Sequence, residues 1–150
     1  MSVRRIRQAL SSYQKGKCEE KGSKFACVYG NGIVDHFIFD PEKFAEQNGH
    51  SGKMVDCFVF VERNNARMSC HIVELKSGTL KIKDIEAKFE DSGNIFSQIR
   101  GHIGVLNEIR LYLIHQCKNS TTIKRFNRMK FAFMGNQYRV ILSKNEYSLN

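Results

Sequence analysis

Two apolar stretches of this chain contain charged side chains that could hold a divalent cation. Asp56 lies within residues 53–61, and Glu74 and Lys76 lie within residues 71–78. Burying an ionised group is costly unless the group is paired or binds a metal. Two carboxylates offer the hard oxygen ligands that Mg²⁺ prefers, and an ammonium group beside them can stabilise negative charge that develops on a phosphate. These three residues are therefore the first candidates for chemistry.

The two stretches have the composition of a β-hairpin. Residues 54–62 and 68–75 are the most β-like segments of the chain, and the polar residues 63–67 join them. In an antiparallel pair, opposed residues share one face of the sheet and their numbers add to a constant. A sum of 130 places Asp56 opposite Glu74, whereas a tight turn at residues 64 and 65 gives 129 and turns Asp56 away. The site therefore requires an odd-membered loop or a bulge.

This arrangement resembles the PD-(D/E)XK superfamily of restriction-endonuclease-like nucleases, in which an aspartate near the start of one strand precedes Glu-x-Lys on the next. Asp56, Glu74 and Lys76 match the motif, with Val55 in place of its proline, and the helix expected after them matches the family's plan. Gln98 takes the place of a glutamine that many members carry on that helix.

One part of the family pattern has no clear match. Many members supply a further glutamate from the first helix, but Glu19 and Glu20 both lie beyond the expected end of that helix. The resemblance covers about residues 50–115.

The resemblance implies a metal-dependent phosphodiesterase, an endonuclease or nuclease subunit that acts on DNA more readily than on RNA. Asp56, Glu74 and the backbone carbonyl of Leu75 would hold Mg²⁺, with Mn²⁺ as a substitute. Lys76 would orient the attacking water or stabilise the developing charge, with Gln98 as a further catalytic candidate. The fold implied is a restriction-endonuclease-like core with a central mixed sheet flanked by helices.

The distribution of charge favours an anionic partner. The 150 residues carry 24 Lys and Arg against 15 Asp and Glu, for a net charge of +9. Residues 1–24 hold seven basic and two acidic side chains, and residues 118–130 hold five basic and no acidic ones, whereas residues 25–117 are slightly acidic. Phosphates bind to basic side chains and metals to carboxylates, so this division suits a nucleic-acid enzyme. The candidate DNA contacts are Arg4, Arg5, Arg7, Lys124, Arg125 and Arg128.

The elements expected along the chain predict one mixed α/β (α+β) domain over residues 1–150, on which a basic N-terminal helical region, residues 1–22, packs. Gly101 and Gly104, inside the last helix expected, suggest a close approach to a neighbouring element. The segments are a helix from 3 to about 15, a hairpin of 25–29 with 33–39, a short helix from 41, the hairpin of 54–62 with 68–75, a helix from 82 to 117, and a β pair of 129–134 with 138–142.

Cysteine use and hydropathy bear on the compartment. The odd number of cysteines shows no disulfide or zinc pattern, so we expect reduced thiols; they are Cys18, Cys27, Cys57, Cys70 and Cys117. No apolar run approaches the length of a membrane span, and no apolar segment follows the basic N-terminus as in a secretory signal. We therefore expect a cytoplasmic protein without a membrane partner.

Two other functions are compatible with the same residues. The chain could be a nucleic-acid-binding module that keeps the fold without turnover, or a basic adaptor for an acidic protein in which Asp56, Glu74 and Lys76 are structural. For the nuclease, a double-strand cut would require a homodimer or a place as a subunit in a larger defence or repair assembly. His71, next to the motif on the opposite face, is expected to pack rather than to catalyse.

Overall fold

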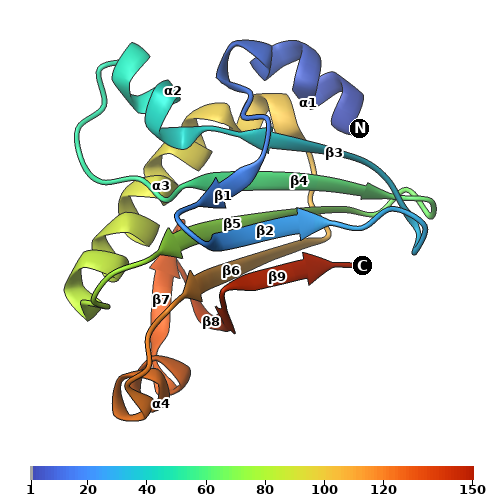
Figure 1. Ribbon diagram of the computed structural model, residues 1–150. Helices are drawn as coiled ribbons and strands as arrows, with labels where there is room; N and C mark the ends of the chain where they lie inside the picture. The colour runs from blue at the N-terminus through green and yellow to red at the C-terminus, as the bar shows by residue number, and fades with distance from the viewer. Residues whose placement is uncertain (1) are drawn as a thin grey trace.

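The computed structural model describes residues 2–150, and Met1 of the basic N-terminal segment lies outside the described residues. Helices and strands are mixed along the chain (Figure 1), which confirms the α+β class. In chain order the elements are α1 (Val3–Leu10), a 3₁₀ turn η1 (Ser11–Tyr13), β1 (Cys18–Glu20), β2 (Ser23–Cys27), β3 (Ile33–Phe39), α2 (Pro41–Gln47), β4 (Cys57–Arg63), β5 (Met68–Lys76), α3 (Ile82–Ile103), β6 (Glu108–His115), α4 (Ser120–Arg128), β7 (Lys130–Phe133), β8 (Asn136–Lys144) and β9 (Glu146–Leu149).

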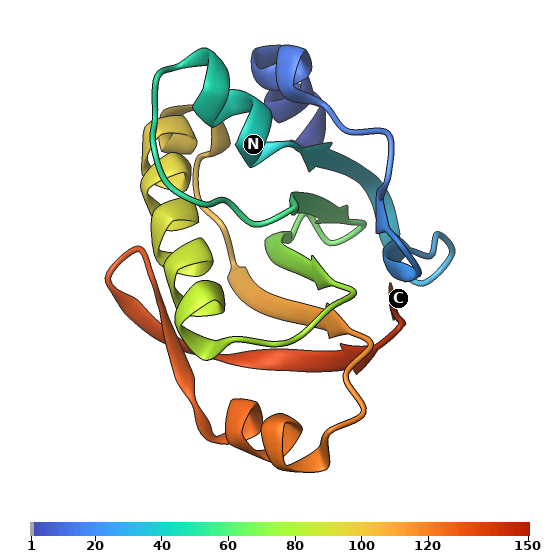
Figure 2. The same cartoon turned by 60° about the vertical axis from the view of Figure 1, so that its left-hand side comes forward.

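A six-stranded mixed sheet with the order β3-β4-β5-β6-β8-β7 forms the centre of the molecule. Helices α1 and α3 lie on one face of it, and a three-stranded sheet, β1-β2-β9, lies on the other (Figures 1 and 2). Phe58 and Ile72 point into the core on the helix side, and Val59 and Val73 into the core below the small sheet. The central strands are therefore buried on both faces, which explains their continuous apolar runs.

The β4–β5 hairpin has the register that the candidate site requires. Cys57 lies opposite Val73 and Phe58 opposite Ile72, so that opposed numbers add to 130. Three residues, 64–66, form the loop, and Ala66 has a positive φ of 65°. An odd-membered loop of this kind commonly ends in a residue of left-handed conformation. The expected hairpin is confirmed, and Asp56 lies at the position facing Glu74.

Two expected elements are wrong. Residues 25–29 and 33–39 do not form a hairpin, because β2 pairs with β1 and β9 while β3 pairs with β4 in the other sheet. The helix expected from 82 to 117 ends at Ile103, and residues 108–115 are the buried strand β6. The apolar residues of β6 fit a helical period by coincidence, because a strand buried on both faces does not alternate.

The glycines of α3 also differ from expectation. Gly104 has a positive φ of 75° and ends the helix, and a Cβ on Gly101 would meet nothing within 4 Å. The close approach occurs at Gly93 instead, where a Cβ would lie 2.9 Å from the backbone nitrogen of Met134. Gly93 therefore permits α3 to pack against the turn between β7 and β8.

Further differences concern α1 and α4. The first helix ends at Leu10 and a single 3₁₀ turn follows, so it is shorter than the expected 3 to about 15. Its buried side chains Val3, Ile6 and Leu10 pack on the main core, as the amphipathic pattern indicates. Residues 120–128, for which no helix or strand was expected, form α4, which Asn119 caps by accepting from the backbone N–H groups of Thr121 and Thr122.

A disulfide bond joins Cys18 of β1 to Cys57 of β4, so the expectation of reduced thiols is wrong for this pair. Both cysteines are buried between the two sheets. The pairing spans 39 residues, and no local spacing of cysteines indicates it. Because Cys57 directly follows Asp56, the bond ties the short strand β1 to the beginning of β4. Within residues 2–150, no helix is long and apolar enough to cross a membrane.

We expect reduction of this disulfide to lower the free energy of unfolding by about 3–4 kcal/mol, because it removes a constraint on a loop of 39 residues in the unfolded chain. Urea denaturation with and without a reductant measures the change. Titration of the denatured, unreduced protein should find three thiols, from Cys27, Cys70 and Cys117. A count of five thiols would show that the bond does not form.

Candidate functional site

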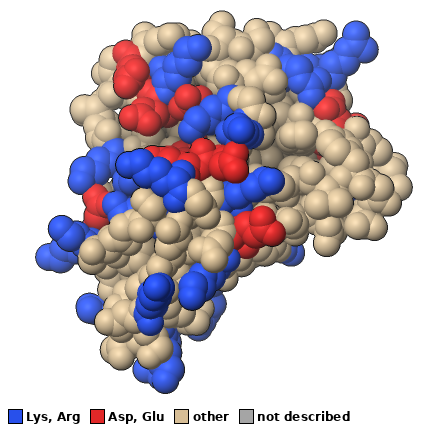
Figure 3. All heavy atoms as spheres, in the orientation of Figure 1, with Lys and Arg blue, Asp and Glu red and all other residues tan. Residues whose placement is uncertain are grey.

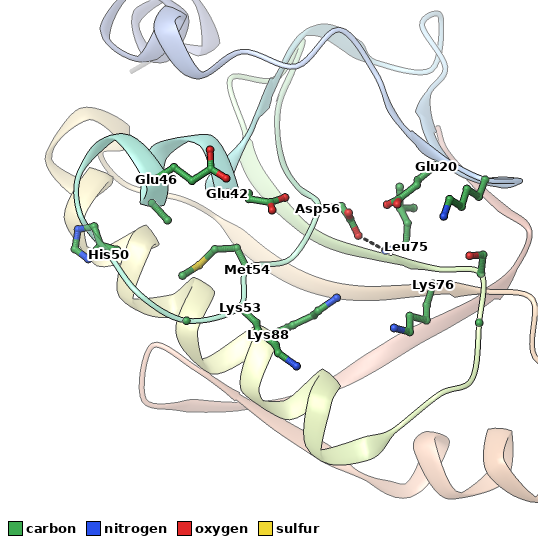
Figure 4. Close-up of a pocket in the computed structure, with 15 residues that line it drawn as sticks. Glu20, Glu42, Glu46, His50, Lys53, Met54, Asp56, Leu75, Lys76 and Lys88 are labelled. Atoms are coloured by element: carbon green, nitrogen blue, oxygen red, sulfur yellow. Dashed lines mark hydrogen bonds between the residues drawn. The ribbon is translucent and has the colours of Figure 1, made fainter.

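A cavity of about 600 Å³ opens where β4 begins and β5 ends (Figure 4). Acidic side chains from β1, from α2 and from residue 56 border one side of it, and Lys53, Lys76 and Lys88 border the other. The charged lining residues are Glu20, Lys21, Glu42, Glu46, Lys53, Asp56, Lys76 and Lys88. Asp56 and Lys76, two of the residues singled out in the sequence, thus face one space, together with Leu75.

Hydrogen bonds fix Asp56 at the end of the hairpin. Its backbone N–H donates to the carbonyl of Val73 at 3.1 Å, and its Oδ2 accepts from the backbone N–H of Leu75 at 2.8 Å. The Nζ of Lys15 donates to its carbonyl oxygen at 3.0 Å. The aspartate therefore continues the antiparallel pairing by one residue and directs its carboxylate across to β5.

Helix α3 holds the segment that leads into Asp56. The backbone N–H of Lys53 donates to Oδ2 of Asp91 at 3.0 Å, and that of Val55 donates to Oγ of the buried Ser92 at 2.9 Å. Gly52 has a φ of 111°, and a Cβ there would lie 2.6 Å from Oδ2 of Asp91. The close contact thus requires glycine, and it sets the path of the chain into the site.

Glu74 is a carboxyl group with no solvent exposure. Its Oε2 accepts from Nζ of Lys88 at 2.5 Å, and its Oε1 has no hydrogen-bond partner among the described residues. Burial raises the pKa of Glu74 to about 9, and the neighbouring Asp56 carboxyl acts in the same direction, against the influence of Lys88. Glu74 therefore lies behind the cavity wall as a protonated group beside Asp56, with one oxygen still available.

Glu20 of β1 is a third carboxyl at this place, and sequence reasoning missed it. A hydrogen bond shared with Asp56 raises the pKa of Glu20, and partial burial adds to the effect. Glu20 reaches Asp56 because β1 crosses the beginning of β4, where the disulfide between Cys18 and Cys57 holds it. No sequence signal could have found this, since a three-residue strand positioned by a distant partner has no period of its own.

Lys53, Lys76 and Lys88 border the opposite side of the cavity, and Asp84 of α3 lies beside two of them. Nζ of Lys53 lies 2.7 Å from a carboxylate oxygen of Asp84, and Nζ of Lys76 lies 3.8 Å from the other oxygen. The hydrogen bond from Lys53 lowers the pKa of Asp84. Lys76 thus lies at the cavity with one acidic neighbour 3.8 Å away, and it is Lys88 rather than Lys76 that contacts Glu74.

Lys88 was also missed, although the sequence carries a signal for it. Ile85 and Phe89 lie on the buried stripe of α3, which places Lys88 at the border of that stripe and facing the sheet. Burial alone would lower the pKa of Lys88, but its hydrogen bond to Glu74 and the nearby acidic charges outweigh burial and raise it. The amine therefore stays charged beside the buried carboxyl.

The structure does not bring Gln98 to this site. Gln98 is exposed and does not border the cavity. It lies ten residues beyond Lys88 on α3, about 15 Å along the helix axis. His71 is buried away from the cavity, where its Nδ1 lies 2.7 Å from the Tyr112 hydroxyl, and burial lowers its pKa to about 3. His71 is thus a packed, neutral side chain, as expected.

The expected DNA contacts fall into two groups. Arg4 and Arg5 are exposed on α1, but Arg7 donates to Asp35 at 2.6 Å and to the carbonyl of His36 at 2.9 Å, so its guanidinium is already engaged. Lys124, Arg125 and Arg128 are exposed on α4. Figure 3 shows basic side chains gathered over the region of α4, whereas both signs of charge meet around the cavity.

The carboxyl groups at the cavity offer oxygen ligands of the kind that a hard cation prefers, but the described residues do not form a complete metal site. In the part of the chain from 2 to 150, no three His, Cys, Asp or Glu side chains converge as a complete metal site. However, Asp56 meets Glu20 on one side and Glu74 on the other, and all their donors are oxygens. The unpartnered Oε1 of Glu74 is the kind of buried acceptor that a cation would satisfy. The residues therefore fit Mg²⁺ or Mn²⁺ in chemical type.

Comparison of the chain with protein-family models, with curated proteins and with solved structures finds no match. The function must accordingly be inferred from the site.

The pKa of Glu74 predicts how stability depends on pH. From about pH 4.5, its ordinary pKa, to about pH 9, the folded state holds a proton that the unfolded state has lost, so stability falls as pH rises. Glu74→Gln has no such proton to lose. We expect its free energy of unfolding to rise relative to the wild type from pH 5 to pH 8 in urea denaturation. Glu86→Gln, on the exposed side of α3, is the control and should follow the wild type. A Glu74→Gln difference that is constant with pH would contradict the raised pKa.

Proposed function

We propose that this chain is a metal-dependent phosphodiesterase that acts on DNA, as its resemblance to the PD-(D/E)XK nucleases implies. One observation carries the proposal: Glu74 is fully buried with an unpartnered oxygen, beside Asp56 and at the end of the strand that presents Lys76 to an open cavity. A structural ion pair with Lys88 uses only one of the two Glu74 oxygens. A cation bound beside Asp56 would give the second oxygen a partner.

Asp56, Glu74 and the carbonyl of Leu75 would hold Mg²⁺ or Mn²⁺, and Glu20 is placed to add a fourth oxygen donor. When bound, the ion would lower the pKa of a water and neutralise charge on the scissile phosphate. The hydrogen bond from Leu75 N–H to Asp56 Oδ2 orients the aspartate and leaves Oδ1 free of that contact. Glu20 would thus supply the carboxylate that the sequence pattern lacked.

Lys76 and Lys53 would bind the phosphate from the other side of the cavity. Lys76 is held at 3.8 Å from Asp84, a loose contact that leaves its ammonium able to hydrogen-bond to an incoming phosphate oxygen or to the attacking water. Lys88 also borders the cavity, but its Nζ donates to the buried Glu74 and limits the negative charge of the carboxyl groups. The two lysines therefore have different roles, one toward the substrate and one toward the acids.

A non-catalytic nucleic-acid-binding module is the second candidate. The observation that favours it is the short contact of Lys88 with Glu74, which stabilises the buried carboxyl without a cation. In that case the cavity lysines would bind phosphate but no bond would be cut.

We expect the protein to cleave DNA in Mg²⁺ or Mn²⁺ and to stop when EDTA is added. Asp56→Asn and Lys76→Ala should each lower the initial rate at least about 100-fold, because one removes an oxygen ligand and the other a charge aimed at the reacting phosphate. Plasmid and single-stranded substrates, followed on gels, give the rates. Glu86→Gln controls for the loss of an acidic side chain that does not border the cavity and should retain the wild-type rate. Salt-sensitive binding with no cleavage by the wild type would establish the binding module instead.

A further inference from the structure

The lysine side of the cavity continues into a basic groove that ends on α4. The cavity shares Lys53 and Lys76 with a second hollow of about 610 Å³, and that hollow shares Lys81 and Lys83 with a third of about 470 Å³ that Arg125 borders. We define the basic groove by these five residues. It passes over the beginning of α3 and reaches the helix that carries Lys124 and Arg128, which Figure 2 shows below α3.

Most cations of the basic groove lack a partner within the chain. Lys81, Lys83 and Arg125 are exposed, and none of them forms an ion pair with any residue from 2 to 150. Asp84 is the one acidic residue among those that border the second and third hollows, and Lys53 and Lys76 already share it. By comparison, Arg7 is paired with Asp35. The groove thus presents free positive charge along a path, which suits a polyanion.

Acidic side chains on the opposite wall of the cavity would repel a polyanion. Glu42 and Glu46 of α2 border the cavity on the side toward α1 (Figure 4), and Glu20 lies close to Asp56. A phosphate chain that leaves the cavity in that direction would meet like charge. The acidic side chains of α2 therefore disfavour an exit toward Arg4 and Arg5 on α1, although Lys21 borders the cavity beside Glu20, and they favour the basic groove toward α4.

The second and third hollows of the basic groove offer side chains for phosphate contacts but no aromatic side chains for base stacking. No Phe, Tyr or His is among the residues that border its second and third hollows; besides the charged residues they present Thr79, Leu80, Ile82, Ala87 and Thr122. Proteins that hold single strands generally stack bases on aromatic side chains, whereas contacts from Lys, Arg and Thr to phosphates are independent of sequence. These features favour a duplex, whose bases are already stacked.

We infer that the basic groove binds the sugar-phosphate backbone of duplex DNA on one side of the scissile phosphate, independently of sequence, and that α1 takes no part. This rests on the proposed function for the identity of the substrate. The proposal differs from the sequence-based expectation that both basic segments grip the DNA: it assigns Lys124, Arg125 and Arg128 to the binding side and leaves out Arg4, Arg5 and Arg7.

A charge-matched comparison tests the inference without requiring cleavage. Binding of a 30-base-pair duplex is measured by fluorescence anisotropy in EDTA, over a range of salt concentrations, for the wild type, Lys83→Ala/Arg125→Ala and Arg4→Ala/Arg5→Ala. Each double variant loses two exposed positive charges, so a general effect of net charge would weaken both equally. We expect the groove variant to lose on the order of tenfold in affinity and about 1.8 in the slope of log K against log salt, while the α1 variant stays within about twofold of the wild type.

Other results would overturn either the groove or the nuclease proposal, and the two failures can be told apart. Equal weakening of both variants, or a larger effect of the α1 variant, would overturn the groove. Tighter binding of a single strand than of the duplex, or equal competition by poly-glutamate, would overturn the duplex backbone as the ligand. If the groove variant alone is weakened but the wild type never cuts DNA in Mg²⁺ or Mn²⁺, the groove stands as a binding surface and the nuclease proposal fails. If the wild type cuts DNA while both variants bind like the wild type, the nuclease proposal stands and the groove fails.

Discussion

A carboxyl group buried at the end of a central strand is the constraint on which this structure depends. Glu74 has no exposed surface, and β5, which carries it, is covered on both faces. A buried carboxyl must keep its proton, be paired, or bind a cation, and the structure combines the first two through a raised pKa and through Lys88. The register of the hairpin, the path of the segment before Asp56 and the position of α3 all serve to place partners around this one group.

The same constraint explains how charge is divided over the surface. Carboxyl groups converge at the end of the hairpin, and the lysines that balance them come from α3 and from the two segments that flank the cavity. The acids of α2 border one side of the cavity, and basic side chains continue from the other side toward α4. Positive charge is therefore concentrated on one side of the site, and the composition of the chain alone does not reveal this.

The sequence predicts those features of the site that depend on residues close together along the chain. Asp56 opposite Glu74 follows from strand pattern and an odd-membered loop, because a hairpin's register is set by residues close in sequence. Glu20 and the Cys18–Cys57 bond depend on how a second sheet lies over the first, and no short-range period records that. The strand β6 was not predicted, because a strand buried on both faces lacks the alternation of apolar and polar residues that indicates a strand. For the same reason the last expected helix was extended well beyond Gln98.

The most direct measurement is Mn²⁺ binding to the wild type, Asp56→Asn and Glu86→Gln, followed by electron paramagnetic resonance of the free ion. If the carboxyl groups of Glu20, Asp56 and Glu74 form a cation site, the wild type and Glu86→Gln bind at least one Mn²⁺ per chain, and Asp56→Asn binds at least about tenfold more weakly. A wild type that binds no Mn²⁺ at millimolar concentration, or an Asp56→Asn variant that binds as well as the wild type, would show that these acids are structural.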